Sequence, residues 1–240
     1  MMLLIILLLT FKVSSEEEQL KCGDNLEYVL NNETLTISGQ GQMYNFTSGK
    51  TKPWKNSLIT KIIIEEGVTS IGDYAFKGSQ FLESVELSNT ITYIGEEAFC
   101  IYPCISKFSL IIPNSVTHIG TYSFYGANIV SIQLSNSLKT IPRVAFRDCK
   151  YLQSLEIPEG VVTIEDYAFA DCNRLTNVTF PSTLENIHEF SFSNCPKIES
   201  IVLQDNVKSI GKNAFDCCTS LVSVTLSKQL TEISESLFVQ

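Results

Sequence analysis

The chain has 240 residues, of which 44% are hydrophobic and 18% charged, and its formal net charge is −9. This composition is typical of a folded protein and excludes an intrinsically disordered one. Because lysine and arginine form no cluster along this acidic sequence, we expect neither nucleic acid nor an anionic membrane surface among its partners.

Residues 1–15 have the pattern of a secretory signal peptide. The apolar run from Met1 to Phe11 is too short to cross a bilayer, and Val13 and Ser15 suit the small-residue positions before a cleavage site. No basic residue precedes the run, so a misassigned start or a buried N-terminal strand is the alternative. Since no later apolar stretch approaches 18 residues, we expect no membrane span in the rest of the chain.

Residues 16–61 precede the repeats and predict a β-rich N-terminal cap. Two short apolar-rich segments, 26–30 and 34–37, flank a pair of asparagines, which is a hairpin pattern. The first coil of a stack exposes an apolar end that needs a cover. We therefore expect Trp54 to pack against the first coil.

Residues 62–240 contain eight copies of one apolar phrase, and each copy ends in phenylalanine. The phenylalanines are spaced by 23, 25, 22, 23, 23, 23 and 23 residues, a regularity that chance does not produce. A period near 23 lies within the range of leucine-rich repeats, so we predict a solenoid of eight stacked coils. The closing residues are Phe76, Phe99, Phe124, Phe146, Phe169, Phe192, Phe215 and Phe238.

The fifth copy illustrates how one coil forms. Leu155 and Ile157 alternate with polar residues, which is the period of a half-buried strand. Pro158 ends that strand because proline has no amide hydrogen to donate. Ala168 and Phe169 then close the coil on a short turn or helical piece. The expected fold is an α/β leucine-rich-repeat solenoid with a parallel β-face and short turns or helical pieces opposite.

The phrase Ile-x-x-x-Ala-Phe recurs with similar surroundings at residues 71–76, 94–99 and 161–172. These segments resemble the BspA-like leucine-rich-repeat family, and residues 34–43 are similar to the cap that precedes its repeats. The resemblance covers nearly all of the chain after the signal peptide. It implies a surface or secreted protein of a group in which several members are implicated in adhesion to host matrix or to other cells. It implies no ligand-site residues.

The last coil is expected to lack a cover, because the chain stops at Gln240, two residues after Phe238. Either the sequence is a fragment, which we favour, or another chain covers this end, for example through self-association.

Two columns of outward-pointing residues on the expected β-face are the candidate ligand-binding strip. Small polar groups there would form a low, flat surface on the usual binding side of such arrays. The alternative is that these residue types merely suit exposed strands. No aromatic or arginine cluster marks a hot spot along the strip. The candidates are Ser84, Glu86, Ser109, Ser131, Gln133, Ser154, Glu156, Asn177 and Thr179.

Three N-glycosylation sequons begin at Asn32, Asn45 and Asn177, in agreement with secretion. A glycan on Asn177 would stand in the middle of the strip and hinder large partners there.

Four cysteines each follow a repeat phenylalanine by three residues and should form a buried ladder. We interpret them as small apolar filler, since a line of residues one coil apart cannot surround a tetrahedral ion; metal or redox chemistry is the alternative. Cys100 and Cys104 flank a short insertion, and either they form a disulfide or Cys104 is exposed and unpaired. No metal or cofactor is expected. The ladder consists of Cys149, Cys172, Cys195 and Cys218.

Catalytic motifs are missing from the sequence. The two histidines, His118 and His188, occupy different repeat positions and are expected to be solvated turn residues. No nucleophile elbow, phosphate-binding glycine loop or HExxH motif occurs, so an enzyme is the third hypothesis. The favoured hypothesis is a secreted or surface-bound scaffold that recognises a protein or glycan on host cells, other cells or matrix. The second is a structural coat protein that self-associates.

Overall fold

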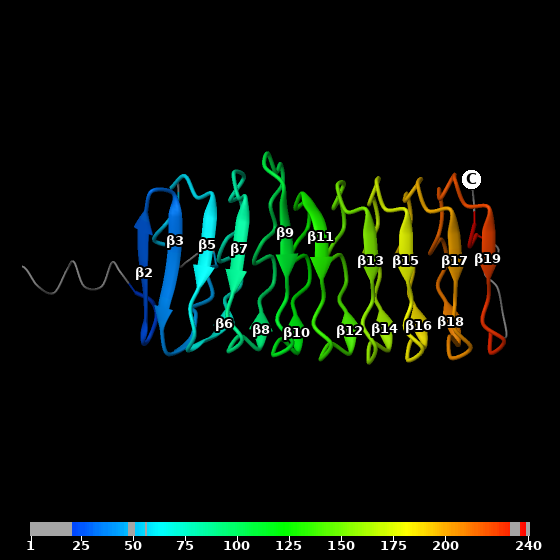
Figure 1. Cartoon of the computed structure of the whole chain (residues 1–240), viewed down its shortest axis with the longest axis horizontal. Coiled ribbons are helices and arrows are strands. Elements are labelled where there is room, and N and C mark those ends of the chain that lie inside the picture. Colours follow the sequence, from blue (N-terminus) through cyan, green and yellow to red (C-terminus); the bar gives the residue numbers. More distant parts are fainter. Residues whose placement is uncertain (1–20, 48–50, 56, 231–235, 239–240) are drawn as a thin grey trace, which may run out of the picture.

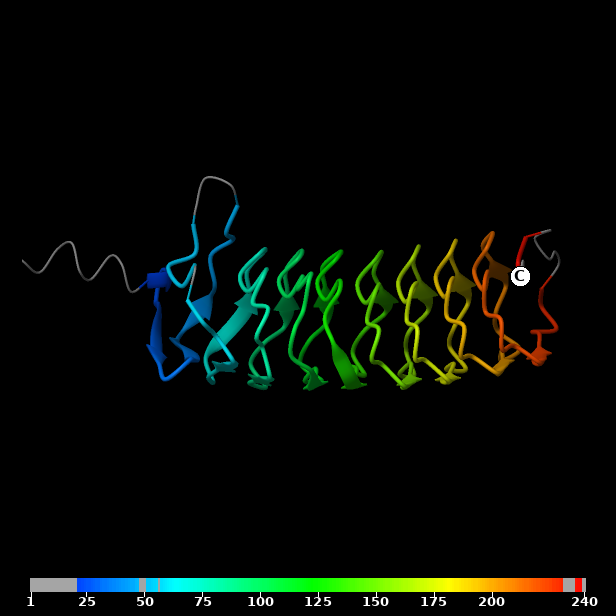
Figure 2. The same ribbon diagram turned by 90° about the horizontal axis from the view of Figure 1, so that it is seen from above.

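Successive coils of the chain lie side by side along one long axis in the computed structural model (Figure 1). The structure describes residues 21–47, 51–55, 57–230 and 236–238, so the predicted signal peptide lies outside the described residues. Seen from above, each coil is a flattened loop stacked on its neighbour (Figure 2). The fold is a parallel β-solenoid of about eight coils, which confirms the predicted repeat architecture.

The first ladder of strands carries the β-face that the alternation predicts. Its hydrogen-bonded groups are β3–β5–β7, in which β3 spans Thr34–Gly39, and β9–β11, β13–β15 and β17–β19. The parallel registers place Leu155 opposite Val178 and Ile201 opposite Val224, and these side chains point inward. The strands are β5 (Lys61–Ile64), β7 (Ser84–Leu87), β9 (Phe108–Ile111), β11 (Ile129–Gln133), β13 (Ser154–Glu156), β15 (Asn177–Thr179), β17 (Ser200–Val202) and β19 (Ser223–Thr225).

A second ladder of strands, which the sequence analysis did not predict, runs along an adjacent side of the coils. Its strands pair in parallel, with Ile164 opposite both Ile141 and Ile187. These isoleucines are buried, so each of these three strands places a side chain in the core. The strands are β4 (Gly41–Gln42), β6 (Val68–Ile71), β8 (Tyr93–Ile94), β10 (His118–Ile119), β12 (Thr140–Ile141), β14 (Thr163–Ile164), β16 (Asn186–Ile187) and β18 (Ser209–Ile210).

The N-terminal cap is the predicted hairpin extended by one strand. Strands β1 (Lys21–Gly23), β2 (Leu26–Asn31) and β3 (Thr34–Gly39) pair antiparallel, and β3 then pairs in parallel with β5. The central turn residues are Asn32 and Glu33, both with left-handed backbones (φ 44° and 65°), which is the twist that suits a two-residue hairpin loop. The cap therefore continues the first ladder.

Turns close the coils, so the prediction of short helical pieces there is wrong. Within the described residues only strands, turns and bends occur, so the fold is all-β rather than α/β. The residue two before each core phenylalanine has a left-handed backbone, which stops a right-handed helix. Alternate amides of the turn donate across coils, as from Phe146 N to Ala168 O (2.9 Å), and the amides between them donate within the coil, as from Ala145 N to Pro142 O. The left-handed residues are Tyr74, Glu97, Tyr122, Val144, Tyr167, Phe190 and Asn213.

The core of the solenoid is a continuous stack of aromatic rings. The seven repeat phenylalanines from Phe76 to Phe215 are fully buried, and neighbouring ring centroids lie 5.1–5.5 Å apart. Trp54 begins the stack on Phe76, with centroids 5.6 Å apart and planes 20° apart. This contact confirms the expected role of Trp54. Its indole N–H donates to the carbonyl of Ala75 at 2.9 Å, which satisfies the one polar group of a buried side chain.

Candidate binding surface

The nine candidate strip residues lie on β7, β9, β11, β13 and β15, on the outer face of the first ladder. Ser154 lies opposite Asn177, which shows that the columns run from coil to coil in register. In the second column Glu156 lies opposite Thr179. All nine side chains are exposed except Ser84, which is half-buried. The structure therefore brings the candidates together as one surface.

Contacts along the strip tie some of its side chains together. The hydroxyl of Ser131 donates to that of Ser109 at 2.8 Å. Lys61 Nζ and Glu86 Oε1 form an ion pair at 2.5 Å with both side chains largely exposed, and such pairs stabilise little. Two exposed apolar residues, Ile111 and Val202, extend the second column. The strip is thus a mostly polar surface with isolated apolar groups.

The three sequon asparagines are all exposed. Asn32 lies in the turn of the cap hairpin and Asn177 on β15. The side-chain oxygen of Asn45 accepts a hydrogen bond from the amide of Asp73 at 2.9 Å, which leaves its nitrogen as the attachment atom. Glycosylation at the three sites stays a prediction.

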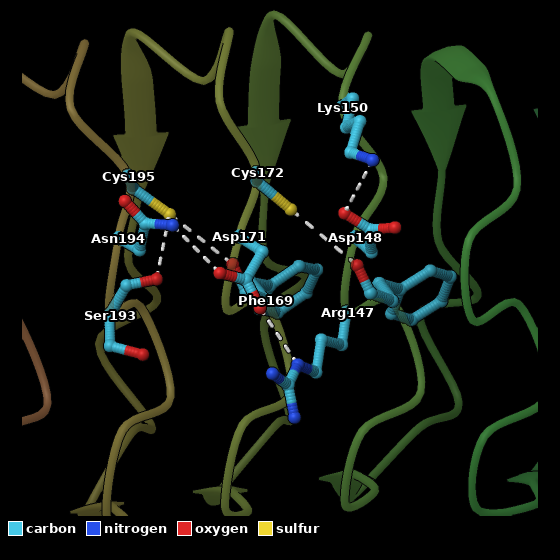
Figure 3. Close-up of polar contacts among 10 residues, drawn as sticks. Arg147, Asp148, Lys150, Phe169, Asp171, Cys172, Ser193, Asn194 and Cys195 are labelled. Carbon is cyan, nitrogen blue, oxygen red and sulfur yellow. Dashed lines mark hydrogen bonds and ion pairs between the residues drawn. The ribbon is translucent and has the colours of Figure 1, made fainter.

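The ladder cysteines are buried filler, and each thiol donates to the carbonyl of a core phenylalanine in a preceding coil. Cys172 Sγ donates to the carbonyl of Phe146 at 3.5 Å, and Cys195 Sγ to that of Phe169 at 3.3 Å (Figure 3). Burial raises the pKa of every ladder thiol, in Cys218 to about 12. The neutral thiol is therefore the favoured form at neutral pH.

Cys100 and Cys104 are free thiols in the structure, which holds no bond between them. Cys104 is half-buried rather than exposed, and its sulfur donates to the carbonyl of Ser106 at 3.2 Å. Burial raises the pKa of the Cys100 thiol to about 11. The insertion is thus held by packing and a local hydrogen bond.

Polar side chains near the ladder cysteines link neighbouring coils. Asp171 accepts from Arg147 Nε through one carboxylate oxygen and from Asn194 Nδ2 through the other, both at 2.8 Å (Figure 3). Asp171 has a left-handed backbone (φ 63°), a conformation that Asp and Asn tolerate better than most residues. The carboxylate therefore bridges three consecutive coils.

Sequence reasoning missed a cluster of tyrosines and arginines along the turns, beyond the strip. The guanidinium of Arg143 lies 5.7 Å from the ring centroid of Tyr122, and that of Arg147 lies 5.2 Å from the ring of Tyr167. Tyr122 and Tyr167 both occupy the left-handed position two before the core phenylalanine. That recurrence was the available signal, but the arginine contacts depend on the stacking of coils.

The two histidines lie apart on the second ladder side. His188 is exposed, and its Nδ1 lies 3.8 Å from Asp166 Oδ1. His118 is also exposed, but it lies on β10 rather than in a turn, and its ring stacks on Tyr93. Over the described ranges, no group of three or more His, Cys, Asp or Glu side chains is placed to hold a metal ion. In the same ranges, no helix has the length and apolarity to cross a bilayer.

Comparisons with solved structures support the solenoid fold. The chain is similar to a leucine-rich-repeat protein from Bacteroides ovatus ATCC 8483, with 21% identity and a TM-score of 0.54 over 90% of this chain and 77% of that chain. It is also similar to the T. pallidum leucine-rich-repeat protein, with 23% identity and a TM-score of 0.54 over 74% of this chain and 90% of that chain. At identities this low, the two similarities support a shared fold and nothing further.

No curated protein matches the chain. A family model, however, does match its sequence. The model described as the BspA type leucine-rich-repeat region matches six copies, over residues 47–155 and 139–240. These ranges include both the repeated phrase and the core phenylalanines described above. The chain is therefore a member of the BspA-type leucine-rich-repeat family.

Proposed function

We propose that this protein is an extracellular or cell-surface binding scaffold that recognises a protein or glycan on host cells, other cells or matrix through the strip on its first ladder. The observation that supports this proposal is the strip itself, in which exposed small polar side chains repeat in register on consecutive strands. Such a surface is flat and presents hydrogen-bonding groups at the spacing of adjacent strands. It suits an extended macromolecular partner better than an enclosed small molecule.

The proposed location draws on three features. The N-terminal pattern of residues 1–15 favours secretion. The three sequon asparagines are exposed, so glycosylation in a secretory pathway would disturb no core contact. Membership in the BspA-type family is in line with a surface protein, as the resemblance of the repeats implies. A glycan on Asn177 would limit large partners to the ends of the strip.

Binding measurements on the full chain test the proposal. Immobilised fibronectin, laminin and collagen, and intact epithelial cells, serve as probes for saturable binding. A strip variant that combines Ser131→Arg and Ser154→Arg places two long cations on the two central strands, where both serines are exposed. We expect this variant to lose at least about tenfold in affinity, because mismatched groups at an interface are left unpaired.

The matched control combines Asn173→Arg and Thr219→Arg. Both residues are exposed and lie in turns outside the strands, so the charge change is the same but the strip is unaltered. The control should bind as the unmodified chain does. Equal loss in both variants, or no saturable binding to any probe, contradicts the proposed function.

A self-associating coat protein is the second candidate. It is supported by one strongly exposed apolar side chain directly before β19, that of Val222, which is 86% exposed. Light scattering that gives larger assemblies with rising concentration, and a monomer for Val222→Glu, would favour this candidate over the first.

A further inference from the structure

The second ladder is interrupted between β10 and β12. At five junctions between neighbouring coils, two backbone amides of one coil donate to two carbonyls of the coil before it. At the junction of β10 and β12 neither bond occurs among the described residues, and the two strands belong to different sheets. The donors at the five regular junctions are Thr92 and Gly95, Thr117 and Gly120, Val162 and Glu165, Glu185 and His188, and Lys208 and Gly211.

Pro142 accounts for one of the two missing bonds. It occupies the position at which Gly120 and Glu165 donate in the coils on either side. Proline has no amide hydrogen, so the carbonyl of Ile119 does not receive the bond that the carbonyl of Ile141 receives from Glu165. The coils remain stacked through their cores, since Phe124 and Phe146 lie parallel at 5.2 Å. The break is therefore confined to the surface layer.

A groove of about 550 Å³ lies over this interruption. Tyr93 and His118 form one side, with their rings stacked at 4.7 Å and 8°. Lys139, Thr140 and Glu165 contribute the other side. Tyr93 is 38% exposed and His118 is also exposed, so the stacked pair presents part of its aromatic surface to solvent beside charged and hydroxyl groups. An aromatic surface flanked by a few converging polar groups is the usual composition of a ligand site.

We propose that this groove is a saccharide-binding site. A pyranose ring has an apolar C–H face that can pack on the Tyr93–His118 pair and hydroxyls that can both donate and accept hydrogen bonds. The carbonyl of Ile119 and the carboxylate of Glu165 are acceptors, and the Lys139 ammonium is a donor. Because two carboxylates, Glu96 and Glu165, and one ammonium, Lys139, line the groove, it favours a largely uncharged sugar over a polyanion.

The site is separate from the strip described above. It lies on the second ladder, whereas the strip lies on the first, and no residue is shared between them. A negative result at one of the two sites would therefore leave the proposal for the other site unaffected.

A printed array of neutral and acidic oligosaccharides, probed with the full chain, tests the proposal. Titration calorimetry with the best-bound sugar then compares variants. We expect saturable binding to neutral sugars and a loss of roughly tenfold in affinity for Tyr93→Ala and for His118→Ala. The matched control is Tyr102→Ala, which removes an exposed tyrosine outside the groove and should leave the affinity unchanged.

Two further variants sharpen the result. Pro142→Gly restores an amide at the interruption, so we expect the groove to narrow and sugar affinity to fall while the melting temperature shows a folded chain. The strip variant with Ser131→Arg and Ser154→Arg should keep full sugar affinity. The absence of saturable sugar binding, binding of acidic sugars only, or unchanged affinity in Tyr93→Ala would overturn the proposal.

Discussion

The rings of Phe124 and Phe146 lie parallel, with centroids 5.2 Å apart and planes 2° apart, although the two residues are separated by a whole coil of sequence. Each ring fills the space beside its neighbour, so the column works as a single core that no one coil could build alone. The stability of the solenoid should therefore be sensitive to any one ring.

Replacing Phe146 with alanine should destabilise the protein by about 3–5 kcal/mol, because a fully buried ring is lost and a cavity remains in the column. Urea unfolding followed by circular dichroism measures the change. Phe81→Ala is the matched control, since Phe81 is 43% exposed and stands outside the ring column. Similar losses in both variants would argue against the stack as the main core.

Replacing Trp54 with phenylalanine should cost about 1–3 kcal/mol. A phenylalanine ring at position 54 can still stack on Phe76, but the buried carbonyl of Ala75 loses the hydrogen bond from the indole N–H. Thermal unfolding of the full chain measures the cost. Because Trp54 is the only tryptophan, its fluorescence in the unmodified chain reports separately on whether the cap opens before the coils.

The turn geometry predicts that Asp171→Ala is less stable than Asp171→Gly by about 1 kcal/mol. Both variants lose the bonds to Arg147 and Asn194, so the difference isolates the left-handed backbone at φ 63°, which glycine adopts without steric cost. Glycine occupies the equivalent position at Gly78 and Gly126, where φ is also positive. Parallel urea titrations decide the order. A more stable alanine variant would contradict the conformation.

Buried thiols predict a loss of stability at alkaline pH. Burial raises the pKa of Cys22 and Cys218 to about 12 in the folded protein, whereas an unfolded thiol ionises near pH 8.5. Above about pH 8.5 the unfolded state therefore binds fewer protons than the folded state. The thiol contribution is complete below that pH and declines by about 1.4 kcal/mol per pH unit and per thiol as pH rises toward 12.

Urea unfolding at pH 7.5, 9 and 10, with reductant present, measures this slope. A double variant, Cys22→Ala and Cys218→Ala, should show a shallower decline than the unmodified chain. Equal slopes in the two proteins would show that these thiols do not carry the effect.

The N-terminal pattern predicts cleavage between Ser15 and Glu16. Expression in a secreting host, followed by mass spectrometry of the medium, should give a mature chain that begins at Glu16. Leu8→Arg interrupts the apolar run and should retain the protein in the cell. The conservative change Leu8→Ile is its control and should be secreted normally. An intracellular chain that keeps Met1 would contradict the secretion hypothesis.

The sequence alone determined the features that repeat with one period. Phe169 marks the core because its type recurs in every coil, and Cys172 marks the ladder because cysteine recurs at the same position in four consecutive coils. The alternation around Leu155 places Ser154 and Glu156 on the outer face. These inferences need only the rule that equivalent positions stack. The family resemblance rests on the same recurrence.

Only the tertiary structure decided what depends on contacts between coils. The second-ladder strands are two to four residues long, too short for an alternation to appear. The left-handed turn position is filled by residues as different as Glu97, Val144 and Tyr167, so no residue type marks it in the sequence. The bridge from Arg147 to Asp171 and the stacking of Tyr93 on His118 join residues about one coil apart. Such contacts depend on how unequal coils align in space, and a one-dimensional pattern does not carry that alignment.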